Sequence, residues 1–208
     1  MRYASLVHAS RHADFPGDLK SEAALRVEDR HQALLRFLDV AVAVLLLAAL
    51  LPLMLVVAAI IRLHDSGPAM FSQQRVGCGG RTFQCLKFRT MVIDAEERLC
   101  AYLAADPEAR SQWEADQKLR NDPRITSLGR LLRKSSFDEL PQLFNVLRGQ
   151  MSMVGPRPIV HSEITRYGRW YLRYCAVQPG ITGLWQVSGR NDTSYRRRVA
   201  CDVLYARR

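Results

Sequence analysis

Two adjacent carboxylates, Asp138 and Glu139, lie among fixed positive charges in the second half of the chain. An Asp beside guanidinium groups can act as the nucleophile that accepts a phosphoryl group. A neighbouring Glu can bind Mg²⁺, which takes one or two carboxylates together with substrate phosphates. The pattern predicts a phosphoryl-transfer site with Asp138 as nucleophile and Glu139 as metal ligand. The surrounding basic residues are Arg130, Arg133, Lys134, Arg148 and Arg157.

The acid pair also fits a simpler interpretation as the start of a helix. Residues 136–139 match a capping box, and acids are common in a first helical turn without any catalytic role. Apolar residues then recur at helical spacing as far as Gly149, which we expect to end the helix. Because Pro141 lacks an N–H group, a start close to Asp138 is favoured, with both carboxylates at the helix tip.

Charge and cysteine content narrow the class of protein. The chain has 208 residues and a formal net charge of +10. The basic excess follows residue 61, which points to nucleic acid, anionic lipid or a phosphorylated substrate as partner. Five cysteines without a C-x-x-C pair argue against a disulfide framework and a zinc site, and indicate a reducing compartment.

An uncharged apolar run over residues 40–61 predicts a membrane segment. A helix of this length extends for about 33 Å, enough to cross a bilayer. Two interpretations stay open: a plain span, and a re-entrant helix broken at Pro52 that enters and leaves on one face. Basic residues flank both ends, so the positive-inside rule places both in the cytoplasm and favours the re-entrant form.

The expected domain organisation is therefore a mobile leader over 1–31, a membrane re-entrant helix over 32–64 and a cytosolic domain over 65–208. The fold class is α+β, mainly helical with a small β-hairpin. The expected elements are a hairpin over 69–91 with its turn at 77–80, a helical pair over 94–118, and helices over 126–134, 161–172 and 195–208.

Two stretches of the cytosolic domain could bind an anionic or aromatic ligand. Prolines on both sides of Arg157 predict a stiff loop that presents one guanidinium group, which suits phosphate binding. Further on, two turns around a short strand over 179–191 would place Trp185 close to Arg190. Trp185 could stack on a base, although a core or interface position is the commoner role of Trp.

Three long segments of the chain resemble one family. They are LKFRTM (86–91), NDPRITSLGRLLRKSSFDELPQLFNVLRGQMSMVGPRP (121–158) and PGITGLWQVSGRND (179–192). In these segments, and over roughly residues 33–205, the chain resembles the bacterial sugar transferases, monotopic phosphoglycosyl transferases that start exopolysaccharide and O-antigen assembly.

The resemblance implies a Mg²⁺-dependent reaction in two steps at the cytoplasmic face of the bacterial inner membrane. A sugar-1-phosphate, with galactose or glucose the expected hexose, passes from a UDP-sugar to the enzyme with release of UMP. It then passes to undecaprenyl phosphate. Inner-membrane lipid is an expected partner, and nucleic acid is not. Whether the chain forms a homo-oligomer is left open.

The resemblance also assigns roles to residues by position. Asp138 matches the family's nucleophile, Glu139 its Mg²⁺-binding partner, and Arg133 an arginine that contacts phosphate. The remaining substrate-binding matches are the basic residues Lys87 and Arg157 and, in the segment associated with nucleotide-sugar binding, Gly183, Gln186 and Arg190.

The sequence departs from the family pattern at two places. Leu51-Pro52 stands where relatives usually have Ser-Pro, and the family usually continues beyond Tyr205 into a further apolar helix, so we expect a truncated C-terminal end. A truncated end leaves open an inactive relative that folds without turnover. The positive charge and the apolar run leave open a second alternative, a non-catalytic, membrane-anchored basic module that binds anionic lipid or nucleic acid.

Overall fold

The computed structural model describes residues 22–116, 119, 121–188 and 194–207. The chain divides into two units, Met1–Phe37 and Leu38–Arg208, and the second unit contains every element described below except the first part of helix α1 (Glu22–Asp65). Most of the expected leader, residues 1–21, lies outside the described residues, and α1 begins before the expected start of the membrane segment at residue 32.

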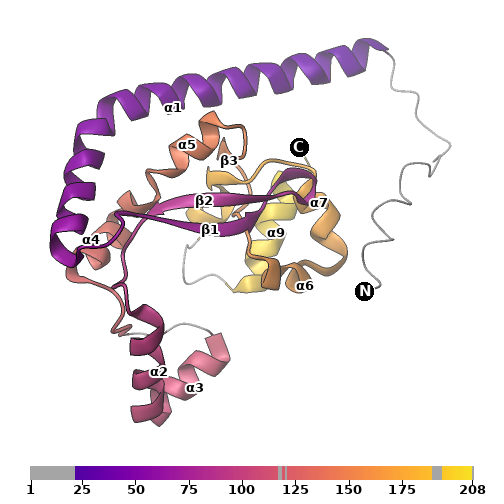
Figure 1. Ribbon diagram of the computed structural model, residues 1–208. Coiled ribbons are helices and arrows are strands. Elements are labelled where there is room, and N and C mark those ends of the chain that lie inside the picture. Colours follow the sequence, from indigo (N-terminus) through magenta and orange to yellow (C-terminus); the bar gives the residue numbers. More distant parts are fainter. Residues whose placement is uncertain (1–21, 117–118, 120, 189–193, 208) are drawn as a thin grey trace. The chain divides into compact units, whose positions relative to one another are not determined.

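Within the second unit, α1 is apolar and largely uncovered. Among the described residues it is the one helix long and apolar enough to cross a membrane, over Gln32–His64. Large side chains such as Leu45, Leu55 and Val56 are mostly exposed. Figure 1 shows that α1 changes direction along its length, and Pro52 lies inside it. A proline removes one backbone hydrogen bond and kinks a helix, which explains the bend.

Both halves of this apolar segment pack against the same body of protein. Before Pro52, Ala43 is fully buried in a cluster with Phe83 and Leu143. After Pro52, residues of α1 are buried in a second cluster: Met54, Val57 and Ile61, with Phe88 and Leu132. Asp39 adds a polar anchor, since its Oδ1 accepts a hydrogen bond of 2.9 Å from the backbone N–H of Met153.

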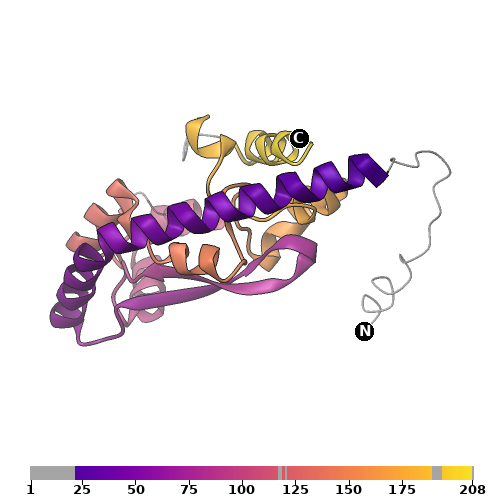
Figure 2. The same ribbon diagram turned by 90° about the horizontal axis from the view of Figure 1, so that it is seen from above.

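The predicted β-hairpin is confirmed. Strands β1 (Met70–Val76) and β2 (Thr82–Phe88) pair antiparallel, and the turn contains the 3₁₀ segment η1 (Cys78–Gly80). Gly79 and Gly80 both have positive φ, which explains the glycines of this turn. In Figures 1 and 2 helix α5 (Gln142–Leu147) lies between the hairpin and the part of α1 that follows Phe37, and all three contribute to the cluster of Ala43, Phe83 and Leu143.

The helices before the acid pair are also confirmed. The pair α2 (Ala95–Ala105) and α3 (Pro107–Asp116) breaks at Asp106, whose Oδ1 accepts hydrogen bonds from the N–H groups of Glu108 and Ala109. Helix α4 (Ser127–Ser135) begins after Thr126, whose hydroxyl accepts from the N–H of Gly129 at 2.9 Å. An N-cap of this kind satisfies a backbone donor that the helix leaves unpaired.

The helix predicted over 161–172 is wrong as a single element. The chain forms η3 (His161–Glu163), α6 (Ile164–Tyr167), η4 (Gly168–Trp170) and α7 (Tyr171–Cys175). Gly168 interrupts them with φ of 49°, a conformation that ends a regular helix.

The C-terminal part adds a second small sheet. The short strand expected between two turns over 179–191 is present as Gly180–Thr182, and the stretch around Trp185 is helical instead. Strand β3 (Ser152–Val154) pairs parallel with β4 (Gly180–Thr182). The expected C-terminal helix is confirmed as α9 (Tyr195–Tyr205), preceded by the short α8 (Leu184–Val187). The structure is thus mainly helical with a small antiparallel hairpin, as the predicted α+β class requires.

The core under α9 contains a buried acid. Asp202 is 2% exposed and its Oδ2 accepts a hydrogen bond of 2.6 Å from the hydroxyl of Tyr167. Burial raises the pKa of Asp202 to about 6, and the hydrogen bond from Tyr167 opposes this rise. The carboxyl group therefore retains its proton at pH values at which an exposed Asp has lost it.

Replacing Asp202 by Asn should remove part of the pH dependence of stability. An acid with a higher pKa in the folded state binds more protons when folded, so the free energy of unfolding falls as pH rises from about 4 to about 6. The gap between 3.8 and about 6 corresponds to about 3 kcal/mol. Unfolding in detergent across this pH range measures the effect.

The amide in Asp202→Asn cannot titrate. The decrease in the free energy of unfolding between about pH 4 and about pH 6 should therefore be smaller in this variant. Tyr167→Phe is the control, because it keeps the acid and removes only its donor, and it should retain the fall. Parallel pH profiles for the unmodified chain and the Asn variant would contradict the assignment.

Candidate active site

The acid pair lies in a 3₁₀ turn between two helices. The turn is η2 (Phe137–Glu139), which follows α4 and precedes α5 (Gln142–Leu147). Asp138 is 8% exposed although it carries a carboxylate. A buried carboxylate needs nearby positive charge or hydrogen-bond donors, so its surroundings decide what it can do.

The expected capping box is wrong, and the reason is the backbone of Ser136. This residue has φ of 60°, in the left-handed region, and its N–H group bonds back to the carbonyls of Arg133 and Leu132. Ser136 therefore ends α4 and does not begin the next helix. The following helix starts at Gln142, beyond Pro141, so the acid pair lies before the helix tip. Its expected end is confirmed at Gly149, with φ of 74°.

Among the described residues, Lys87 of strand β2 is the cation that forms ion pairs with both members of the acid pair. Its Nζ lies 2.6 Å from Glu139 Oε1 and 3.8 Å from Asp138 Oδ2. The structure therefore joins three predicted site residues from segments about 50 positions apart. Lys87 is bonded to Glu139 and attracts Asp138 from slightly farther away.

Arg133, in the last turn of α4, is a second cation that interacts with Asp138. Its Nε donates a hydrogen bond of 2.9 Å to the hydroxyl of Thr90, just beyond β2. The Asp138 carboxylate lies close enough to favour the charged form of Arg133, against the effect of burial on its pKa. Arg133 thus belongs to the same cationic group as Lys87, as predicted.

Burial and charge act on Asp138 in opposite directions. Burial raises the pKa of Asp138 above its ordinary value, and the Lys87 ammonium group is the largest influence that lowers it. Glu139 adds to the rise and Arg133 to the fall. Burial is the first of these causes, so Asp138 is a partly dehydrated carboxyl group that depends on neighbouring cations for its charge.

The remaining predicted cation, Arg157, belongs to a second cluster. Its Nη1 donates to Glu163 Oε1 at 3.2 Å, and its backbone N–H points to Asp202 Oδ1 at 3.4 Å. Arg75 of β1 donates to the carbonyl of Pro158 at 2.9 Å. The loop around Arg157 is therefore held from the hairpin and from α9, as its expected stiffness requires.

The segment expected to bind the nucleotide sugar lies beside this second cluster. Trp185 of α8 lies under the guanidinium groups of Arg157 and Arg198, at 6.0 and 5.6 Å. Gly183 is buried against Gly155, where any side chain would collide with the Gly155 carbonyl. Gly183 therefore contributes close backbone packing.

Polar atoms near Trp185 lack internal partners. Among the described residues, the Trp185 Nε1 and Gln186 Oε1 atoms are buried without a hydrogen bond. Such atoms are expected where a ligand completes the hydrogen bonding. Arg190 lies outside the described residues, so its predicted approach to Trp185 stays a prediction.

One face of the hairpin connects the two clusters. Arg75 lies opposite Phe83 in the register, and side chains on one strand face alternate, so Phe83, Cys85 and Lys87 share a face. Four residues of strand separate Phe83 from Lys87, or about 14 Å. The hairpin therefore carries both clusters on one scaffold, with the buried side chains of Phe83 and Cys85 between them.

The donor set suits a hard divalent cation that substrate also binds. Asp138 and Glu139 are adjacent carboxylates, and no cluster of three or more His, Cys, Asp or Glu residues that could hold a metal occurs within the described ranges. Mg²⁺ commonly takes one or two carboxylates and completes its shell with water and phosphate oxygens. The acid turn fits this mode of binding.

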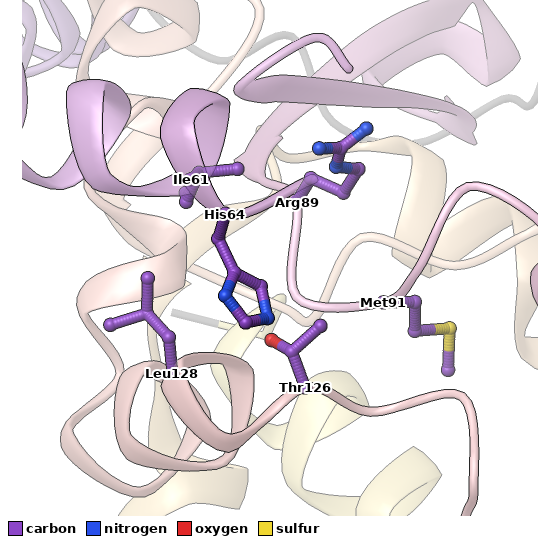
Figure 3. A pocket seen from close by; sticks show the side chains of 6 residues that line it. All are labelled: Ile61, His64, Arg89, Met91, Thr126 and Leu128. Carbon is purple, nitrogen blue, oxygen red and sulfur yellow. The ribbon is translucent and has the colours of Figure 1, made fainter. Parts of the chain in front are cut away.

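A small pocket elsewhere does not contain the predicted chemistry. It lies where the end of α1 meets the residues after β2 and the start of α4 (Figure 3). His64 and Thr126 point toward each other there, whereas the Arg89 guanidinium group points away from them. None of the predicted site residues lines it, and it offers no carboxylate.

The sequence analysis missed several polar residues that support the site. Asn145 is fully buried beside β2, and Asp202 and Glu163 hold the Arg157 loop. Arg198 adds positive charge next to Arg157, since both guanidinium groups lie over Trp185. An Asn in a short helix or an Asp in a basic helix has no distinctive sequence signal, because its importance comes from burial.

Comparison with known proteins points to one family. A family model described as bacterial sugar transferase matches residues 30–208. The undecaprenyl-phosphate galactose phosphotransferase of Salmonella typhimurium is 57% identical over 144 residues, which cover 69% of this chain and 30% of that protein. The UDP-galactose-lipid carrier transferase of Erwinia amylovora is 48% identical over 172 residues, covering 83% and 36%.

A shorter relative aligns over more of its own length. The exopolysaccharide production protein ExoY of Sinorhizobium fredii is 47% identical over 170 residues, which cover 82% of this chain and 75% of that protein. The chain spans about a third of the length of the Salmonella and Erwinia relatives. With the family model matching from residue 30 onward, the chain belongs to the bacterial sugar transferase family.

Proposed function

We propose that this chain transfers a sugar-1-phosphate from a UDP-sugar to undecaprenyl phosphate, as the first membrane step of exopolysaccharide biosynthesis. The observation that carries the proposal is Asp138, a buried carboxylate held beside Lys87 and Glu139. The names of the Salmonella and Erwinia relatives support a lipid acceptor and a hexose donor, with galactose or glucose expected. They give no support to a non-catalytic basic module.

In the first step, an Asp138 carboxylate oxygen attacks the phosphorus that carries the sugar. A new acyl-phosphate bond forms, the pyrophosphate bond breaks, and UMP leaves with the bridging oxygen and its electron pair. Partial dehydration makes the carboxylate more reactive, and Lys87 and Arg133 offset negative charge that develops on the phosphoryl oxygens.

In the second step, an oxygen of undecaprenyl phosphate attacks the same phosphorus. The acyl-phosphate bond breaks, Asp138 is regenerated as a carboxylate, and the product is undecaprenyl diphosphate-sugar. One carboxylate thus serves a water-soluble donor and a lipid acceptor in turn. This sequence requires an acid turn close to the membrane surface.

The packing of α1 supports that placement through a re-entrant helix at the cytoplasmic face of the bacterial inner membrane. In a straight helix, Ala43 and Ile61 would be about 27 Å apart along the axis. Both contact the unit that holds the acid turn, while Leu45 and Leu55 between them remain exposed. A bend at Pro52 lets lipid cover the exposed residues while both ends stay on one side.

Mg²⁺ is part of the proposal, with Glu139 as its ligand and Asp138 nearby. When bound, the ion would neutralise charge on the substrate phosphates. Lys87 and Arg133 would offset the negative charge of the phosphate oxygens that the ion does not contact. Arg157, with Gln186 and Arg190, is assigned to the nucleotide-sugar end of the substrate.

Replacing Asp138 by Asn should abolish transfer, because the amide cannot form the acyl-phosphate bond. We expect UMP release to fall by about 10³-fold or more, together with loss of the phosphosugar adduct detectable by mass spectrometry of the intact protein. Asp94→Asn is the matched control, since Asp94 is an exposed acid paired with Arg98. Normal turnover in Asp138→Asn would refute the role of Asp138.

Replacing Glu139 by Gln should weaken the response to Mg²⁺. Loss of a residue that only supports a metal ligand typically weakens metal binding by about 10- to 100-fold. Loss of Glu139, a direct ligand, should raise the Mg²⁺ concentration for half-maximal UMP release by at least that factor. Glu96→Gln on the exposed first turn of α2 is the control. An unchanged metal titration would exclude Glu139 as a ligand.

The re-entrant form predicts that both flanks of the apolar run face the cytoplasm. Exposed Cys78 in the hairpin turn reports on the C-terminal flank, and Ala33→Cys reports on the N-terminal flank. Cys100 is replaced by Ser because it is also exposed. A membrane-impermeant maleimide should label neither cysteine in intact cells and both after permeabilisation. Labelling of one flank in intact cells would establish a full span.

A further inference from the structure

Asn145 is a fully buried polar residue for which the proposed reaction has no direct use. It lies in α5, the helix that follows the acid turn, and is 0% exposed. A buried amide is costly unless its donors and acceptor are all bonded. Its bonds lead to the strand that carries Lys87.

The Asn145 side chain occupies the free edge of β2. Its Oδ1 accepts a hydrogen bond of 3.0 Å from the N–H of Leu86, and its Nδ2 donates to the carbonyl of Gln84 at 2.7 Å. In an antiparallel pair, alternate residues direct their backbone groups away from the partner strand. The amide therefore takes the place of a third strand at residues 84 and 86, with β1 on the other edge.

A third bond orients the amide itself. Nδ2 of Asn145 also donates to Gln150 Oε1 at 2.7 Å. With both donor bonds made, the amide has one orientation in which oxygen meets Leu86 N–H and nitrogen meets Gln84 carbonyl. Asp would lack the donors, and Gln would be too long for the same two contacts, so the arrangement is specific for Asn.

These bonds join the two elements whose separation sets the site. Leu86 immediately precedes Lys87, and α5 continues from the turn that carries Asp138 and Glu139. The Lys87 Nζ to Glu139 Oε1 distance of 2.6 Å depends on how β2 and α5 lie relative to each other. Apolar packing also joins the two elements: Phe83 and Cys85 share a cluster with Leu143 and Val146, and Phe88 shares another with Phe144. Apolar contacts are non-directional, whereas the hydrogen bonds of Asn145 are directional.

We propose that Asn145 is a positioning residue for the proposed transfer: its amide binds the edge of β2 and so holds Lys87 against the acid turn. This inference rests on the proposed function for its effect on the reaction. The hydrogen-bonding role itself can be measured without any activity.

Hydrogen exchange tests the clamp in the full chain in detergent. In Asn145→Ala, the amide of Leu86 should exchange faster, together with its neighbours in β2. Val203→Ala truncates a buried side chain in a third core cluster, which contains Val199, Tyr167 and Tyr174 but no residue of β2. It is the control for general loss of stability and should leave the exchange of Leu86 unchanged. Unchanged exchange at Leu86 in Asn145→Ala would overturn the proposal.

A double-variant cycle tests the consequence for the reaction. Asn145→Ala should slow formation of the phosphosugar adduct in a single turnover, by up to about a hundredfold for a displacement near 1 Å. Lys87→Gln should slow it directly. If Asn145 acts through Lys87, the double variant should be hardly slower than Lys87→Gln alone, whereas multiplied effects would overturn the proposal.

Gln150→Ala covers the outcome in which Asn145→Ala does not fold. It keeps the Asn145 side chain and removes only the acceptor that orients it, so the same changes should appear in weaker form, and their absence would overturn the proposal. If the unmodified chain forms no adduct, the proposed function fails, and hydrogen exchange alone then decides whether the clamp exists.

Discussion

The structure depends on the contact between a buried carboxyl group and cations from distant parts of the chain. Asp138 lies almost out of contact with water, and burial alone favours the protonated acid. Lys87 and Arg133 oppose that tendency, yet they come from a strand and a helix that are distant in sequence. The fold must therefore fix a strand, a helix and a tight turn relative to one another within hydrogen-bonding tolerance.

The β-hairpin is the element that meets this requirement. One strand face carries Lys87 at the acid turn and, opposite Phe83, Arg75 at the loop of Arg157. The same strand is buried against both halves of α1 through Phe83 and Phe88. The hairpin thus contacts both charge clusters and the apolar helix. This explains how so small a sheet can position the other elements of the unit.

The membrane segment brings its own constraint. Large apolar side chains along α1 remain uncovered by protein, and in water such a surface is unfavourable in proportion to its area. Contact with lipid removes that penalty, and the bend at Pro52 keeps both halves packed on the same unit. One packing arrangement therefore holds the apolar helix and the elements next to the acid turn together.

The sequence by itself determined the pieces whose signals are local. Hydrophobic periodicity and turn residues predicted the hairpin, α2 with α3, α4 and α9, and the uncharged run predicted the apolar helix. Residue types around the acid pair pointed to Asp138, Glu139 and Arg133, and the resemblance to the sugar transferases added Lys87. The structure brings these four together. The secondary-structure patterns suffice for the helices and the hairpin because each depends on neighbours in the chain.

Only the tertiary structure decided the features that depend on distant neighbours. Ser136 adopts a left-handed conformation that ends α4, although its sequence context favours an N-cap. The parallel pairing of β3 with β4 joins segments whose short lengths carry no periodic signal. The roles of Asn145 and Asp202 arise from burial and from partners far away in the chain, and a polar residue gains such a role only after the backbone around it has been brought together.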